Sequence, residues 1–97
     1  MIAHFSDKGT EDIFQRVESR EARRVLPVEL HRNAAKKLAM INAARFVEDL
    51  KIPPGNRLEK LKGTLEGHYS VRINDQWRIV FRWADGSAFD VRICDYH

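Results

Sequence analysis

Asp95, Tyr96 and His97 place an acid, a phenol and an imidazole side by side in the last three positions of the sequence. An imidazole has an ordinary pKa of about 6.5, so it exchanges protons near neutral pH, and a neighbouring carboxylate favours its protonated form. Terminal residues of small domains are often not selected for chemistry, so the tripeptide needs support from the segment before it. The pattern indicates acid–base chemistry.

That preceding segment is rich in cationic side chains at alternating, strand-like positions. We expect RNA-binding residues among Lys60, His68, Arg72, Arg82 and Arg92. Guanidinium groups bind phosphates through two parallel hydrogen bonds, and tyrosine stacks on unpaired bases. The alternative is that these arginines only keep solvent-facing strands soluble and protect sheet edges. The two interpretations stay open at this point.

The elements that position these side chains begin with helices. Residues 2–5 predict a short edge strand, and Thr10 predicts the N-cap of a helix that carries Ile13, Phe14 and Val17 on one face and ends near Arg20. Apolar residues recurring at helical spacing predict a longer helix over residues 28–49. The Pro-Pro-Gly sequence at 53–55 then ends that helix.

Beyond residue 56 the apolar period changes from 3.6 to 2, which predicts strands near 57–61, 69–73, 77–83 and 89–95. Asp85-Gly86 predicts a hairpin turn between the last two strands. In the last strand, Phe89, Val91 and Ile93 are expected on the apolar face. Helices segregated from strands indicate an α+β fold of order β-α-α-β-β-β(-β), with two N-terminal helices on one face of a small, mainly antiparallel sheet. The opposite face is then expected to be open and positive, with Arg78 among its arginines.

Composition limits the class of protein. The 97 residues suit a single domain over 1–97, and 17 Lys and Arg against 14 Asp and Glu give a net charge of +3, which suits a polyanionic partner. Cys94 is the only cysteine, and the histidines have no metal-ligand spacing, so we expect no disulfide, metal or cofactor. No stretch reads as a signal peptide or a membrane span, so we expect a cytoplasmic protein without a membrane partner.

Three motifs follow one another along the second half of the sequence. They are Leu61-Lys62-Gly63, Asn74 followed by Trp77-Arg78-Ile79, and the closing Asp95-Tyr96-His97. Together with the order of helices and strands, they resemble HigB-type toxins of bacterial type II toxin–antitoxin systems, in the RelE/ParE superfamily. The resemblance covers essentially the whole chain. It implies a RelE-like fold and a ribosome-dependent mRNA interferase, which cuts messenger RNA in the ribosomal A site during translation.

The resemblance also implies partners and site residues. It implies neutralisation by a helix-turn-helix, HigA-like antitoxin, with operator DNA bound only indirectly, through that antitoxin. The family's functional positions carry over onto Lys62, Arg78, Asp95, Tyr96 and His97. Some HigB toxins have a histidine where Glu59 stands in this sequence, which is a departure from the family pattern.

The chemistry can also be assembled from the residues. Cleavage of RNA without a metal needs a base for the ribose 2′-hydroxyl, an acid for the leaving 5′-oxygen and cations for the charged phosphorane. We expect His97 to be the leading proton-transfer residue, with Asp95 positioning or activating it. Arg78 and Lys62 are expected to stabilise the phosphate, and Tyr96 to stack on a base or assist proton transfer.

Two other functions compete with this hypothesis. A ParE-like toxin would poison DNA gyrase without being a nuclease, and it would have no need of the Asp95-Tyr96-His97 group. A noncatalytic module would bind nucleic acid or a protein through the open sheet.

Overall fold

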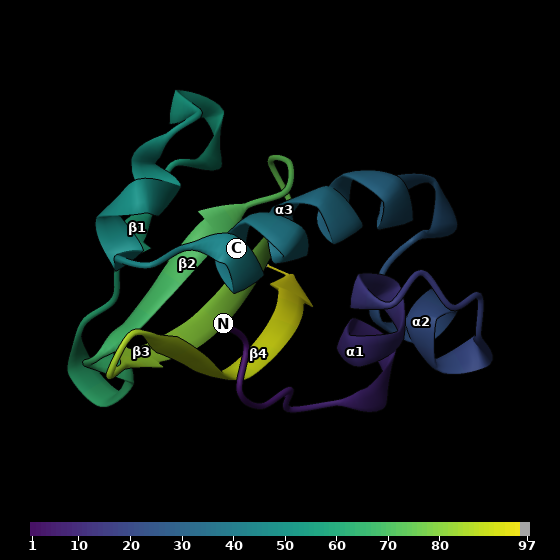
Figure 1. Cartoon of the computed structure of the whole chain (residues 1–97). Coiled ribbons are helices and arrows are strands. Elements are labelled where there is room, and N and C mark those ends of the chain that lie inside the picture. The colour runs from purple at the N-terminus through teal and green to yellow at the C-terminus, as the bar shows by residue number, and fades with distance from the viewer. Residues whose placement is uncertain (96–97) are drawn as a thin grey trace.

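The computed structural model describes residues 1–95 and has the α+β architecture that the sequence predicts. Its sheet contains β1 (Glu59–Lys60), β2 (His68–Arg72), β3 (Trp77–Ala84) and β4 (Ser87–Asp95), all antiparallel and in the order β1-β2-β3-β4. The helix α3 (His31–Ala43) crosses one face of the strands, while α1 (Lys8–Phe14) and α2 (Arg20–Val25) gather beside β4 (Figure 1). No helix within residues 1–95 is long and apolar enough to span a membrane.

The first predicted helix is shorter than expected, and a second one follows it. Asp7, not Thr10, is the N-cap: its Oδ1 accepts a hydrogen bond of 2.6 Å from the Thr10 backbone N–H. The helix α1 ends at Phe14, and Val17 is 47% exposed instead of joining the apolar stripe. Ser19 caps the additional helix α2, so three helices stand where two were predicted.

The longer helix, α3, ends at Ala43, six residues before its predicted end at 49. The reason is a local cap, because the Asp49 carboxylate accepts hydrogen bonds of 3.1 Å from the backbone N–H groups of both Arg45 and Phe46. A side chain that binds nearby backbone groups competes with a continuing helix. A 3₁₀ turn, Val47–Lys51, follows and still contributes buried Val47 and Leu50 to the core.

The core fills the space between α3 and the near face of the sheet. It includes Leu38 and Ile41 from the helix and Val71, Ile79 and Phe81 from β2 and β3, each at most 1% exposed. The alternation predicted for these strands is therefore confirmed. Asp85 and Gly86 also form the predicted hairpin turn, with φ angles of 52° and 76°, the left-handed pair that a tight hairpin requires.

One residue departs from that alternation. Phe89 was expected on the apolar face with Val91, but a bulge shifts the register between Val80 and Arg82, so Phe89 lies opposite Arg82. Asp90 has a φ of 55° in the bulge, and the guanidinium carbon of Arg82 lies 4.7 Å from the centre of the Phe89 ring. Phe89 therefore belongs to the face that carries the arginines.

The N-terminal residues cover the free edge of β4. Ile2 and Phe5, in the predicted edge strand, form isolated parallel bridges to Ala88 and Val91. Further along the same edge, the buried Thr10 hydroxyl accepts a 3.2 Å hydrogen bond from the Ile93 backbone N–H. A side chain of α1 thus continues the hydrogen bonding that the N-terminal segment begins, which protects the strand edge.

We expect Thr10→Val to lower the free energy of unfolding by about 1–3 kcal/mol, because the substitution keeps the shape but leaves the Ile93 N–H buried without its acceptor. Urea unfolding of the two proteins measures the difference. Thr10→Ser is the matched control, since it keeps the hydroxyl. If Thr10→Val were as stable as the parent, the hydroxyl would not be what satisfies this edge.

Candidate active site

The strand register brings the predicted arginines onto one face of the sheet, the face away from α3. Arg72 lies opposite Arg78, His68 lies opposite Arg82, and Arg92 lies opposite Val80. We call this surface the arginine face, defined by Arg72, Arg78, Arg82 and Arg92. The shared face that strand alternation predicts is thus confirmed by the pairing of β2, β3 and β4.

Arg78 lies between Arg72 of β2 and Cys94 of β4, near one end of the sheet. It is only 7% exposed, which corrects the expectation of a fully open face. Its Nη2 donates a hydrogen bond of 2.6 Å to the Arg57 carbonyl oxygen and a longer one of 3.4 Å to the Ser70 carbonyl oxygen. Burial of a charge is costly unless polar atoms surround it. These carbonyls stabilise the positive charge and fix the orientation of the guanidinium.

The other arginines are held differently. Arg72 donates a hydrogen bond to Asp75 in the following turn and holds the pKa of that carboxyl below its ordinary value. Arg82 lies 3.5 Å from the Asp90 carboxylate. Within residues 1–95, the Arg92 guanidinium forms no hydrogen bond or ion pair. Acidic neighbours therefore offset part of the positive charge, and Arg92 is the arginine most available to a polyanion.

Asp95 is the last residue of β4 and lies opposite Trp77, one position beyond the pair formed by Arg78 and Cys94. Its Oδ2 accepts a hydrogen bond of 3.0 Å from Gln76 Nε2. Strand alternation gives Cys94 the face of Arg78 and gives Asp95 the opposite face, with Trp77, at the very end of the strand. The other two predicted residues, Tyr96 and His97, lie outside the described residues.

Cys94 lies between two cationic side chains. Burial raises the pKa of its thiol, and the positive charges of Arg92 and Arg78 partly oppose that rise. The thiol is therefore neutral at pH 7 and is a poor nucleophile, as expected of a packed side chain.

The predicted Lys62 lies toward the other end of the sheet. The backbone N–H of its neighbour Leu61 donates to the His68 carbonyl oxygen at 2.9 Å, and His68 is four residues along β2 from Arg72, the partner of Arg78. At about 3.3 Å per residue, this separates the two positions by about 13 Å along the strand. The structure does not bring the backbones of Lys62 and Arg78 together.

Lys62 instead lines a shallow hollow of about 330 Å³ at the β1–β2 connection, together with Lys60 and Glu66. Lys60 pairs with Tyr69, so alternation assigns Lys60 to the helix side of the edge strand. Glu59 pairs with Ser70 and takes the arginine face. The departure from the family pattern at Glu59 therefore lies on the same face as Arg78.

Two buried polar atoms on the arginine face are unusual. Among the described residues, His68 Nδ1 and Ser70 Oγ have no hydrogen-bond partner. Buried polar atoms are nearly always hydrogen-bonded in native proteins, so such atoms mark a place for a bound water or a substrate group. His68, which the sequence predicts for RNA binding, lies opposite Arg82, and Ser70 lies between His68 and Arg72 on the same face of β2, so Ser70 joins the residues of the candidate site.

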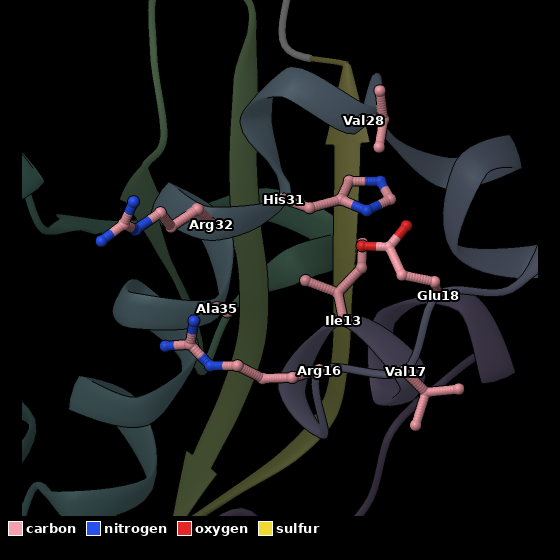
Figure 2. A pocket seen from close by; sticks show the side chains of 8 residues that line it. All are labelled: Ile13, Arg16, Val17, Glu18, Val28, His31, Arg32 and Ala35. Atoms are coloured by element: carbon pink, nitrogen blue, oxygen red, sulfur yellow. The ribbon is translucent and has the colours of Figure 1, made fainter.

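A second hollow, of about 280 Å³, lies on the helical side of the molecule, between the end of α1 and the start of α3 (Figure 2). Ile13, Val17 and Val28 give it apolar walls, and Arg16 and Arg32 project at one side. His31 lies in its centre and hydrogen-bonds the Leu26 carbonyl oxygen through Nε2 at 2.8 Å, so it is a structural histidine. None of the residues predicted for chemistry lines this hollow.

Sequence reasoning missed the turn that supports Arg78. The Pro-Pro-Gly sequence predicted a turn, but it gave no sign that the next carbonyl but one, that of Arg57, would contact Arg78, 21 positions later. It also missed Phe89, because an alternating pattern contains no signal for a bulge. The polar residue that follows Pro-Pro-Gly, Asn56, was the one available hint of a buried hydrogen-bonded turn.

Comparisons with known proteins agree with this geometry. A family model, described as the RelE-like toxin HigB of a type II toxin–antitoxin system, matches residues 3–97. Toxin HigB-1 of Vibrio cholerae is 39% identical over 90 residues, which cover 93% of this chain and 92% of that protein. A Proteus vulgaris protein named endoribonuclease HigB is 39% identical over 41 residues, or 42% of this chain and 45% of that protein.

Solved structures support the fold. A chain of the YoeB–YefM complex from Staphylococcus aureus superposes with a TM-score of 0.62 at 23% identity, covering 100% of this chain and 98% of that one. YafQ from Escherichia coli superposes with a TM-score of 0.58 at 14% identity, covering 98% and 93%. At such low sequence identity, these two structures show only that the fold is shared. The family match over nearly the full length and the Vibrio cholerae relative go further: this chain belongs to the HigB family of RelE-like toxins of type II toxin–antitoxin systems.

Proposed function

We propose that this toxin is a ribosome-dependent mRNA interferase, an endoribonuclease that cuts messenger RNA in the ribosomal A site while the message is translated. The observation that carries the proposal is Arg78, a nearly buried cation held by two carbonyl oxygens on a basic sheet face, one position from the strand end at Asp95. Membership of the HigB family and the name of the Proteus vulgaris relative support it.

The reaction needs no metal. A base removes the proton of a ribose 2′-hydroxyl, and the 2′-oxygen forms a bond to the adjacent phosphorus. The bond from phosphorus to the 5′-oxygen then breaks, and an acid protonates that oxygen. The products are a 2′,3′-cyclic phosphate and a new 5′-hydroxyl end. The phosphorane that forms between these steps carries extra negative charge, which preorganised cations stabilise.

We assign roles on this basis. His97 is the leading proton-transfer residue, and Asp95 positions or activates it. Arg78 stabilises the phosphorane, because its fixed guanidinium needs little reorganisation when charge develops. Tyr96 stacks on a base or assists proton transfer.

The remaining cations bind the RNA along its backbone. Arg72, Arg82, Arg92 and His68 are spread over the arginine face. Lys62 extends the basic surface to the β1–β2 connection, where Lys60 adds positive charge from the helix side of the edge strand. The distance of Lys62 from Arg78 along the sheet favours a contact with a neighbouring phosphate over one with the phosphate that reacts.

Type II toxins are partnered by antitoxins. For this chain we propose a HigA-like antitoxin with a helix-turn-helix domain, which binds operator DNA on behalf of the complex. Because the proposed substrate is translated messenger RNA, the toxin acts in the cytoplasm, where ribosomes translate.

The experiment that tests the activity induces the toxin in cells and maps new 5′-hydroxyl ends in messenger RNA. Cuts confined to translated codons, and abolished when translation initiation is blocked, are the expected result. Supercoiling defects without new ends would instead support a gyrase poison. Neither effect would support a noncatalytic binding module.

We expect His97→Gln to slow cleavage of ribosome-bound messenger RNA by about 10²- to 10⁴-fold, the usual contribution of a general acid or base. Single-turnover assays on programmed ribosomes measure the rate. His4→Gln is the matched control, because His4 is an exposed histidine that pairs with Asp90 at the N-terminal edge. An unchanged rate in His97→Gln would show that His97 does not transfer the proton.

We expect Arg78→Ala to reduce the cleavage rate by about 100-fold or more, the typical cost of losing a group that stabilises developing charge. Arg78→Lys restores only a small part, since an ammonium cannot keep the carbonyl contacts and grip a phosphate as a planar fork does. Arg24→Ala, on the exposed side of α2, removes an equal charge elsewhere and leaves the rate unchanged. Full activity in Arg78→Lys would mean that only a positive charge is needed.

A further inference from the structure

The turn before β1 holds a backbone carbonyl against Arg78. Arg57 has φ 45° and ψ 54°, a left-handed conformation that few residues other than glycine adopt. In this conformation its carbonyl oxygen accepts the 2.6 Å hydrogen bond from Arg78 Nη2. Uncommon backbone conformations persist only where surrounding contacts enforce them, and they occur frequently at functional sites.

The contact that enforces this turn is the side chain of Asn56, which is fully buried. Its Nδ2 donates hydrogen bonds to the carbonyl oxygens of Leu50 at 3.1 Å and Ile52 at 3.5 Å. Its backbone N–H donates to the Pro53 carbonyl oxygen at 3.0 Å. One amide therefore ties both ends of the 50–56 segment together and leaves the next residue, Arg57, little freedom.

Lys37 of α3 completes the connection by donating from its Nζ to Asn56 Oδ1. The side chain is partly buried, and burial lowers the pKa of its ammonium, with the nearby charges of Lys36 and Arg72 adding to the effect. Partial burial of the ammonium against a neutral amide costs free energy, which a fully exposed lysine would not lose. Its contact fixes which way the Asn56 amide points.

We propose that Lys37 and Asn56 are positioning residues for Arg78. They hold Arg57 in its left-handed turn, so that the Arg57 carbonyl orients the Arg78 guanidinium toward the phosphate that reacts. The inference rests on the proposed catalytic role of Arg78. It connects α3, on one side of the sheet, to the arginine face on the other, through two hydrogen bonds joined by the peptide bond between Asn56 and Arg57.

A guanidinium anchored at one nitrogen keeps its remaining donors in a fixed plane, because the group is rigid and planar. Loss of the hydrogen bond to the Arg57 carbonyl leaves the positive charge in place, but the guanidinium plane is no longer held in one orientation. Misplacement of a catalytic group by about 1 Å can cost about 100-fold in rate, with little effect on substrate binding. The expected signature is therefore a loss in kcat without a change in KM.

The test replaces Lys37 with Met, which keeps the apolar stem and removes the ammonium. In cleavage assays on programmed ribosomes, we expect kcat to fall by about tenfold or more, up to the ~100-fold limit above, with KM within twofold of the parent value. Lys37→Arg, which keeps a cationic donor, recovers most of kcat. Lys36→Met is the matched control, because it removes the same charge from an exposed neighbour on the same helix and leaves both constants unchanged.

A double variant separates positioning from a general structural effect. In an Arg78→Lys background, where the guanidinium is already absent, Lys37→Met should lower kcat by less than twofold. An equal loss in both backgrounds would overturn the proposal, as would a parent-like kcat in Lys37→Met. Thermal unfolding of each variant confirms that the compared proteins are folded.

A second measurement does not depend on cleavage. The Arg78 side-chain N–H groups of the isotope-labelled protein, observed by NMR, should be protected from exchange with water in the parent and at least tenfold less protected in Lys37→Met. If the parent does not cleave RNA but shows this change, the proposed activity fails and the positioning contact stands. Equal protection in the two proteins would overturn the positioning role.

Discussion

The guanidinium of Arg78 carries a full charge in a residue that is 7% exposed, and the carbonyl oxygens of Arg57 and Ser70 make that location possible. Both carbonyls accept hydrogen bonds from the same nitrogen, Nη2. The Ser70 carbonyl comes from the neighbouring strand, and the Arg57 carbonyl comes from a turn that reaches across from the helical layer. The position of the Arg78 side chain therefore depends on the sheet register, on the geometry of the turn and on the placement of α3.

Much of the sheet could be predicted because its information is local. Alternation along β3 puts Ile79 and Phe81 on one face and Arg78 and Arg82 on the other, whatever the rest of the chain does. The bulge that moves Phe89 is different, since a left-handed φ at Asp90 leaves no mark in an alternating pattern. The helix ends differ from the predicted ones for a related reason. Asp7 and Asp49 accept hydrogen bonds from nearby backbone N–H groups, and the sequence alone does not show which of several polar residues does so.

The candidate site was predictable in its residue types and less so in its geometry. Strand alternation placed the arginines together, and the sequence motifs that resemble HigB toxins marked Arg78. The contact of Arg78 with Arg57 spans 21 positions and depends on a turn conformation, so no local pattern reports it. Lys62 shows the opposite case. Its motif is the one that precedes the motif of Arg78 in the sequence, yet the β1–β2 connection places Lys62 far from Arg78 along the sheet.

We propose that this toxin cuts RNA by attack of a ribose 2′-hydroxyl. The most direct test gives programmed ribosomes a messenger RNA with a single 2′-deoxyribose immediately 5′ of the phosphate that is cut in the all-ribose message. We expect the toxin to cleave the all-ribose message and to leave the substituted one intact at that phosphate. Equal cleavage of the two messages would contradict it.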